Sequence, residues 1–140
     1  MLYYSQAIQK EQTLQIIRYM ESNNGKDTHH ASSAYGSYGI KPTTALELGY
    51  KITKKNEHEV ASKLYDKLST IAKGNTRDIV YGWLKGSNGL RRQYNKPLYY
   101  RNIENHWHVL KYRKYIPLYM GMYSNLFNWS FYETNSYRGY

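Results

Sequence analysis

The chain has 140 residues, which fits one domain built around a single hydrophobic core. Its 20 Lys and Arg residues against 10 Asp and Glu residues give a formal net charge of +10, which predicts attraction to polyanions such as nucleic acid, an anionic membrane surface or an anionic cell wall. Cysteine is absent, which excludes disulfides, thiolate metal sites and a cysteine nucleophile.

The first part of the chain predicts one helix followed by a long loop. A helix is expected over residues 6–22, because apolar side chains recur three positions apart and form one stripe: Leu14, Ile17 and Met20. Glu21 lies at the C-terminal edge of that stripe. Residues 24–41 are rich in Gly, Ser, His and Tyr and show no period, so they predict a long structured loop or a short irregular hairpin.

The following part of the chain also predicts helices. A short helix opened by a proline is expected over residues 42–48. A longer one over residues 56–73 buries one apolar face: Val60, Leu64, Leu68 and Ile71. Further helices are expected over residues 77–84 and 97–115, separated by a turn at residues 86–89. The sequence therefore predicts a mainly α fold.

Three short segments carry the residues of chemical interest. Glu21 and Ser22 close the first helix. Residues 36–40 read Gly-Ser-Tyr-Gly-Ile, and Pro-Thr-Thr-Ala follows at residues 42–45. Residues 82–86 read Gly-Trp-Leu-Lys-Gly. A glutamate at a helix end, a glycine-rich loop and an aromatic residue in a later helix thus follow one another in this order.

These segments resemble the motifs of the lytic transglycosylase family of the lysozyme-like superfamily, especially its short bacteriophage forms. That family has Glu-Ser at a helix end, then Gly-x-x-Gly-Leu-Met-Gln with Pro-x-Thr-Ala, then Ala-Tyr-Asn-x-Gly and a later Tyr. The resemblance covers about residues 11–103. It implies a lysozyme-like catalytic domain over residues 1–115, with the Gly/Tyr-rich loop or small hairpin beside the active-site cleft. A Tyr-rich extension over residues 116–140 would pack on that domain or be partly mobile.

The resemblance implies a peptidoglycan-degrading enzyme that cleaves the β-1,4 bond between MurNAc and GlcNAc, with Glu21 as the single catalytic acid/base. A carboxylic acid can protonate the leaving oxygen at neutral pH if an apolar setting raises its pKa, and we expect such a setting at the edge of the apolar stripe. In this family the substrate's acetamido group stabilises the anomeric centre, and the product carries a 1,6-anhydro end. No cofactor and no metal ion are expected.

The residues expected to contact the glycan come from the same segments and from a later pair of tyrosines. Glycines let a loop backbone approach a sugar closely, and aromatic rings stack on pyranose faces. The predicted substrate-binding residues are Ser22, Tyr35, Tyr38, Gly39, Ile40, Trp83, Tyr99 and Tyr100. The chain departs from the family pattern at two points, since no Gln follows Ile40 and Leu84 stands at the position of the Asn.

Three other interpretations stay open. A muramidase-type hydrolase would use Glu21 with Asp27 as a second carboxylate, although an aspartate in such a loop is typical of an Asx-turn. A basic module for nucleic acid would combine the Tyr and Arg side chains of residues 91–115. A catalytically inactive relative would bind glycan only. Two histidine pairs lack the spacing of a metal site: His29-His30 and His106 with His108.

The expected partners are peptidoglycan glycan strands and the anionic cell-wall surface, with no dedicated nucleic-acid partner and a monomeric state. The first residues lack the basic region and apolar stretch of a signal peptide, and no apolar run approaches the roughly 20 residues that span a membrane. We therefore expect a phage virion-associated protein, or an endolysin made in the host cytoplasm that acts on the cell wall.

Overall fold

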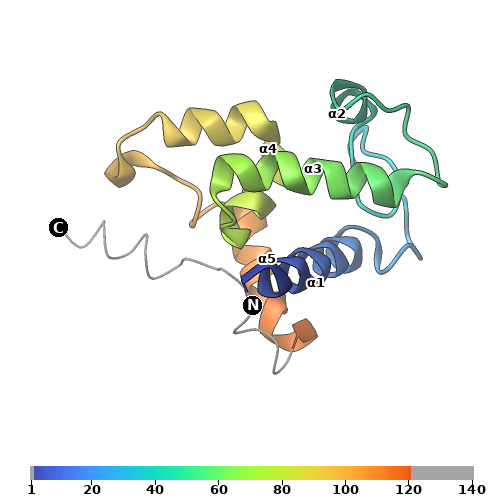
Figure 1. The fold of residues 1–140 in the computed structure, drawn as a ribbon, viewed down its shortest axis with the longest axis horizontal. Coiled ribbons are helices and arrows are strands. Elements are labelled where there is room, and N and C mark those ends of the chain that lie inside the picture. The colour runs from blue at the N-terminus through green and yellow to red at the C-terminus, as the bar shows by residue number, and fades with distance from the viewer. Residues whose placement is uncertain (1, 121–140) are drawn as a thin grey trace. The chain divides into compact units, whose positions relative to one another are not determined.

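The computed structural model describes residues 2–120, and within this range the chain is mainly helical (Figure 1). The only paired extended backbone among them is an isolated antiparallel bridge between Tyr35 and Ile40. The prediction of a mainly α fold is therefore confirmed. The elements are α1 (Leu2–Ser22), α2 (Pro42–Glu47), α3 (Glu57–Ala72), α4 (Thr76–Tyr94), the 3-10 turn η1 (Leu98–Tyr100) and α5 (Trp107–Met120).

The chain divides between Lys67 and Leu68 into two compact units. We call residues 2–67 the N-terminal unit and residues 68–120 the C-terminal unit. The predicted start of a C-terminal extension at residue 116 falls inside α5. Residues 121–140 of that extension lie outside the described residues. No helix in the described range combines the length and the hydropathy that a membrane crossing requires.

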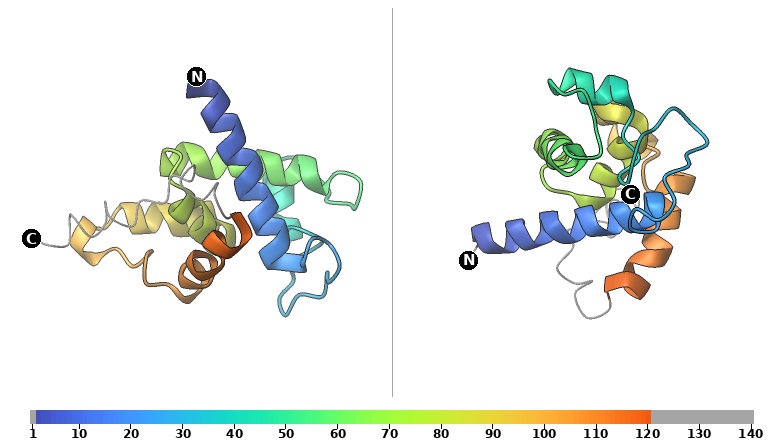
Figure 2. Two further views of the ribbon diagram at one scale, coloured as in Figure 1. Left: turned by 90° about the horizontal axis from the view of Figure 1, so that it is seen from below. Right: turned by 90° about the vertical axis from the view of Figure 1, so that its right-hand side faces the viewer.

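The N-terminal unit is built on α1, which both views of Figure 2 show as one straight helix running into the loop of residues 23–41. Its core joins apolar side chains of α1, the loop, α2 and α3, and each of these side chains is at most 4% exposed: Leu14, Ile16, Ile17, Ile40, Ala45, Val60, Ala61 and Leu64. The apolar stripe predicted for the first helix is confirmed at Leu14 and Ile17, whereas Met20 is half-buried. The last turn of α1 is thereby fixed against the core.

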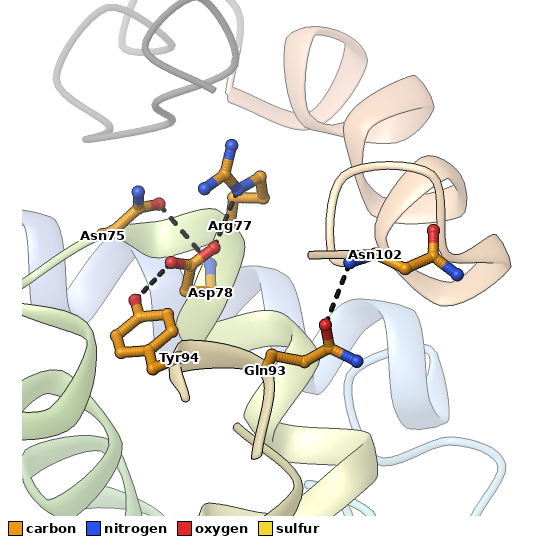
Figure 3. Close-up of polar contacts among 6 residues, drawn as sticks. All are labelled: Asn75, Arg77, Asp78, Gln93, Tyr94 and Asn102. Carbon is orange, nitrogen blue, oxygen red and sulfur yellow. Dashed lines mark hydrogen bonds and ion pairs between the residues drawn. The ribbon is translucent and has the colours of Figure 1, made fainter. Parts of the chain in front are cut away.

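The C-terminal unit contains a helix that folds back on itself. Within α4, Gly86 adopts φ 77° and ψ 168°, a conformation that favours glycine, and the helix then resumes and continues to Tyr94. A straight helix of 19 residues would be about 28 Å long, yet the Tyr94 hydroxyl donates a hydrogen bond to the Asp78 carboxylate at the other end (Figure 3). The two arms of α4 therefore form a helical hairpin. The predicted turn over residues 86–89 was wrong in extent, because Gly86 alone leaves the helical conformation.

A buried carboxylate joins the two ends of this hairpin. Asp78 is 3% exposed, and its Oδ1 accepts a hydrogen bond from Arg77 Nε at 2.8 Å while Oδ2 accepts one from the Tyr94 hydroxyl. The Asn75 side chain caps the helix by accepting the Asp78 backbone N–H at 3.4 Å (Figure 3). Burial, and then the neighbouring Asp78 carboxylate, raise the pKa of Tyr94 well above its usual value. These partners offset the cost of burying the charge.

The helix predicted over residues 97–115 was wrong in its first half. Only one 3-10 turn forms at residues 98–100, and α5 begins at Trp107. The intervening backbone is bonded differently. The His106 N–H donates to the Ile103 carbonyl at 3.1 Å in a turn. The Asn102 N–H donates to the Gln93 side chain of α4 at 2.9 Å (Figure 3). Asparagine at residues 102 and 105 favours such turns over a continuous helix.

Candidate functional site

The site predicted from the sequence begins with a close contact between Glu21 and the glycine-rich loop. Glu21 is the penultimate residue of α1 and is half-buried. A Cβ atom placed on Gly39 would lie 2.7 Å from Glu21 Oε1 and 3.3 Å from its Cγ, so the Glu21 side chain would have to move to make room for it. Gly39 also has φ +62°, where L-residues are strained. The glycine therefore allows the loop backbone to lie directly on the glutamate side chain.

Ser22 fixes the end of α1 to the same loop. Its hydroxyl oxygen lies 2.7 Å from the Ser37 carbonyl oxygen and 2.9 Å from the Arg18 carbonyl oxygen, and it accepts the Gly25 N–H at 2.8 Å. Ser22 is 2% exposed. We predicted that it would contact substrate, but in this structure its hydroxyl is bonded to main chain beneath the loop. Through these bonds it connects the end of α1 to the loop.

Glu57 holds the loop from the other side, and it was not among the residues singled out in the sequence. Its Oε2 accepts a hydrogen bond from the Ser37 N–H at 2.9 Å. A side chain on Gly36, which has φ +74°, would collide with this oxygen. Glu57 lies in the first turn of α3, twenty residues from Ser37, and no sequence spacing connects the two. The peptide groups of Ser37 are thus bonded to α3 through N–H and to α1 through C=O.

The loop itself closes as a very short hairpin. The Tyr35 N–H donates to the Ile40 carbonyl at 2.9 Å, and the Ile40 N–H donates back to the Tyr35 carbonyl at 3.1 Å. Ile40 is 2% exposed and belongs to the core of the N-terminal unit, whereas Tyr35 is 37% exposed. The His30 ring nitrogen Nε2 lies 2.7 Å from the Gly36 carbonyl oxygen and adds a further hydrogen bond. Residues 35–40 are therefore closed by a single antiparallel bridge.

Tyr38 is a buried residue in this loop. Its ring is 6% exposed, and its hydroxyl is hydrogen-bonded to His58 Nδ1 at 2.7 Å. Burial is the main cause that raises the pKa of this hydroxyl. We predicted that Tyr38 would stack on a sugar, but stacking needs an exposed ring face, and the structure places this ring in the core. Tyr35 is the aromatic residue of the loop that keeps an exposed ring.

The remaining predicted site residues belong to the C-terminal unit. Trp83 is 8% exposed and lies in the core of that unit, so its ring is not a free face for a sugar. Tyr99 and Tyr100 are 67% and 68% exposed, and their rings meet edge to face with centroids 5.3 Å apart. Gly86, the last residue of the Gly-Trp-Leu-Lys-Gly segment, is the break in α4. The first arm of α4 therefore ends at Gly86, whose backbone conformation favours glycine.

The residues considered for other chemistry have local structural roles. Asp27 is exposed, and its Oδ1 accepts the His29 N–H at 3.1 Å, which is the Asx-turn expected for it. The His106 ring nitrogen Nδ1 accepts the His108 N–H at 3.2 Å. Among the residues that the structure describes, no three His, Cys, Asp or Glu side chains are grouped so that they hold a metal ion.

Comparisons of the chain with protein-family models, with curated proteins and with solved structures gave no significant match. Function is therefore inferred from the residues themselves. The arrangement with the most chemical content is a half-buried glutamate at a helix end, beside a glycine-rich loop that two polar side chains hold in place. A carboxyl group is one of the side-chain groups that can carry out acid/base chemistry.

Proposed function

We propose that this protein is a peptidoglycan lytic transglycosylase on a lysozyme-like fold, cleaving the β-1,4 bond between MurNAc and GlcNAc with Glu21 as its acid/base. The contact between Glu21 and Gly39 carries the proposal, because it joins the Glu-Ser helix end to the Gly-x-x-Gly loop, the first two segments that resemble the family. The buried bonds of Ser22 support it, since they explain why a serine follows the glutamate.

The proposed reaction needs one carboxyl group. Glu21 first donates its proton to the glycosidic oxygen, while the carbonyl oxygen of the MurNAc acetamido group bonds to the anomeric carbon. The bond between that carbon and the glycosidic oxygen breaks in the same step, and the GlcNAc side leaves with a free hydroxyl. The Glu21 carboxylate then removes the proton of the C6 hydroxyl, whose oxygen displaces the acetamido oxygen and closes a 1,6-anhydro ring. The first step requires a neutral carboxyl.

Fixed loop geometry supports such a reaction, because an acid/base group must stay within hydrogen-bond reach of the oxygen it serves. Ser22 and Glu57 hold the two peptide groups of Ser37, and the hairpin bonds of Tyr35 and Ile40 close the loop around them. The exposed ring of Tyr35 next to this loop is the aromatic surface of the N-terminal unit best placed to stack on a sugar.

The proposal is tested by incubating the wild-type protein, Glu21→Gln and Glu11→Gln with isolated peptidoglycan and identifying the soluble muropeptides by mass spectrometry. Glu11 is an exposed glutamate of the same helix and serves as the matched control. We expect anhydro-ended products from the wild type and from Glu11→Gln, and a rate at least about a thousandfold lower from Glu21→Gln.

Products with reducing ends would instead assign a muramidase-type hydrolase. Asp27→Asn and Glu57→Gln would then identify its second carboxylate. A wild-type protein that releases no product from several wall types would refute the enzymatic function and leave a binding protein.

A further inference from the structure

The charges of the two units differ strongly. Residues 2–67 carry 9 Lys and Arg residues and 7 Asp and Glu residues, a formal charge of +2. Residues 68–120 carry 10 Lys and Arg residues but only 2 Asp and Glu residues, a formal charge of +8. Four-fifths of the excess positive charge of the described chain therefore resides in the C-terminal unit.

The surface of the C-terminal unit is more strongly positive than its composition suggests, because its acidic residues are buried. Its two acidic residues, Asp78 and Glu104, are only 3% and 4% exposed. Nine of its basic residues are exposed or half-exposed, and we call them the basic surface: Lys73, Lys85, Arg91, Arg92, Lys96, Arg101, Lys111, Arg113 and Lys114. Over the described part of this unit, no acidic side chain is therefore exposed among these cations. In the N-terminal unit, by contrast, all seven acidic side chains are exposed or half-buried.

Exposed apolar side chains gather on the same unit. It contains seven of the nine large hydrophobic residues that are exposed in the described chain: Leu84, Leu98, Tyr99, Tyr100, Trp107, Leu110 and Tyr115. Residues 91–101 combine both features, with four cations and two strongly exposed tyrosines in eleven residues. This segment is ordered by Arg101, which donates to the Tyr94 carbonyl at 3.0 Å and to the Lys96 carbonyl at 3.2 Å.

We propose that the C-terminal unit anchors the protein to the anionic cell wall, with the basic surface pairing with wall carboxylates and with Tyr99, Tyr100 and Trp107 stacking on sugar rings. Cations alone would suit any polyanion, and aromatic rings alone any neutral sugar. An anionic polysaccharide uses both at once, as does a single-stranded nucleic acid. The choice of a glycan over other polyanions rests on the proposed function. Anchoring of this kind keeps an enzyme on an insoluble substrate between cleavage events.

The test is co-sedimentation of the full chain with isolated peptidoglycan, using the Glu21→Gln background so that the wall stays intact. Three double variants are compared: Arg91→Glu with Arg92→Glu, Tyr99→Ala with Tyr100→Ala, and Lys54→Glu with Lys55→Glu. The last pair is exposed on the N-terminal unit and changes the charge by the same amount as the first. We expect about tenfold weaker binding for each C-terminal pair, less than a twofold change for the control, and weaker binding at high salt.

Two results would overturn the anchoring proposal. Equal losses from the Arg91/Arg92 and Lys54/Lys55 pairs would mean that net charge alone acts. Unchanged wall binding, with losses only toward single-stranded DNA or anionic phospholipid vesicles, would assign a nucleic-acid or membrane partner instead.

The anchoring proposal and the proposed function fail separately. Wall binding that depends on the C-terminal pairs, from a wild-type protein that cleaves nothing, would remove the enzyme and retain the anchor. Cleavage by the wild type, together with wall binding that the C-terminal pairs do not change, would retain the enzyme and remove the anchor.

Discussion

The carboxylate of Glu57 accepts the backbone N–H of Ser37, while the Ser22 hydroxyl bonds the carbonyl oxygen of the same residue. One residue of the glycine-rich loop is thereby held by the start of α3 and the end of α1. The loop in turn lies on Glu21 through Gly39. The position of the proposed acid/base relative to its loop thus depends on two side chains that need not touch substrate.

The first prediction concerns Glu57 as a positioning residue. Replacing it with Ala removes the acceptor for the Ser37 N–H, so we expect kcat on peptidoglycan to fall roughly tenfold or more with a small change in KM. Glu57→Gln keeps an acceptor oxygen and should restore most of the rate. Glu59→Ala, an exposed neighbour in the same helical turn, is the control. Equal rates for Glu57→Ala and Glu59→Ala would exclude this role.

The second prediction separates backbone strain from the displacement of Glu21. Gly39→Ala and Gly49→Ala both place a side chain at positive φ, which costs about 1 kcal/mol. A Cβ on Gly49 meets no atom within 4 Å, whereas one on Gly39 meets the Glu21 carboxylate. We expect similar losses of stability in urea unfolding, but a large loss of activity for Gly39→Ala only. An active Gly39→Ala protein would show that the contact is dispensable.

The third prediction concerns the hydroxyl of Ser22. Ser22→Ala leaves the Gly25 N–H and the Ser37 carbonyl without this buried partner, so the free energy of unfolding should fall by about 1–3 kcal/mol. Ser33→Ala changes an exposed loop serine and should cost less than about 0.5 kcal/mol. Urea unfolding followed by circular dichroism measures both. A neutral Ser22→Ala substitution would contradict the assigned bonds.

The fourth prediction is a pH dependence of stability in the C-terminal unit. Burial, with smaller contributions from His106 and Lys111, lowers the pKa of His108 from 6.5 to about 4. Between these values the unfolded chain binds a proton at His108 that the folded chain does not, so stability falls as the pH drops from about 6.5 toward 4. The full loss is on the order of 3 kcal/mol.

The variant His108→Phe keeps an aromatic ring against Tyr112 but cannot titrate. Its unfolding free energy should depend less on pH between 7.5 and 4.5 than that of the wild type, when both are measured in urea. His29→Phe, in an exposed loop position, is the control and should retain the wild-type slope. Identical slopes for His108→Phe and the wild type would assign the acid sensitivity to other groups.

The sequence by itself determined the helical elements whose apolar residues repeat at helical spacing. The first helix and the helix over residues 57–72 were predicted close to their observed bounds, because burial of one face decides such elements locally. It also placed Glu21, Ser22 and the glycine-rich loop in one motif. Gly36 and Gly39 of that loop adopt positive φ, where glycine avoids the strain that other residues would have.

Only the tertiary structure decided which side chains meet across long separations. The bonds of Glu57 to Ser37 and of Tyr94 to Asp78 join residues 20 and 16 positions apart, and no periodicity encodes such pairs. Burial likewise decided that Tyr38 and Trp83 belong to the core while Tyr99 and Tyr100 face solvent. A tyrosine or tryptophan suits either environment, because its apolar body packs and its polar tip accepts a partner or water. Packing around each ring, rather than its identity, therefore decides between core and surface.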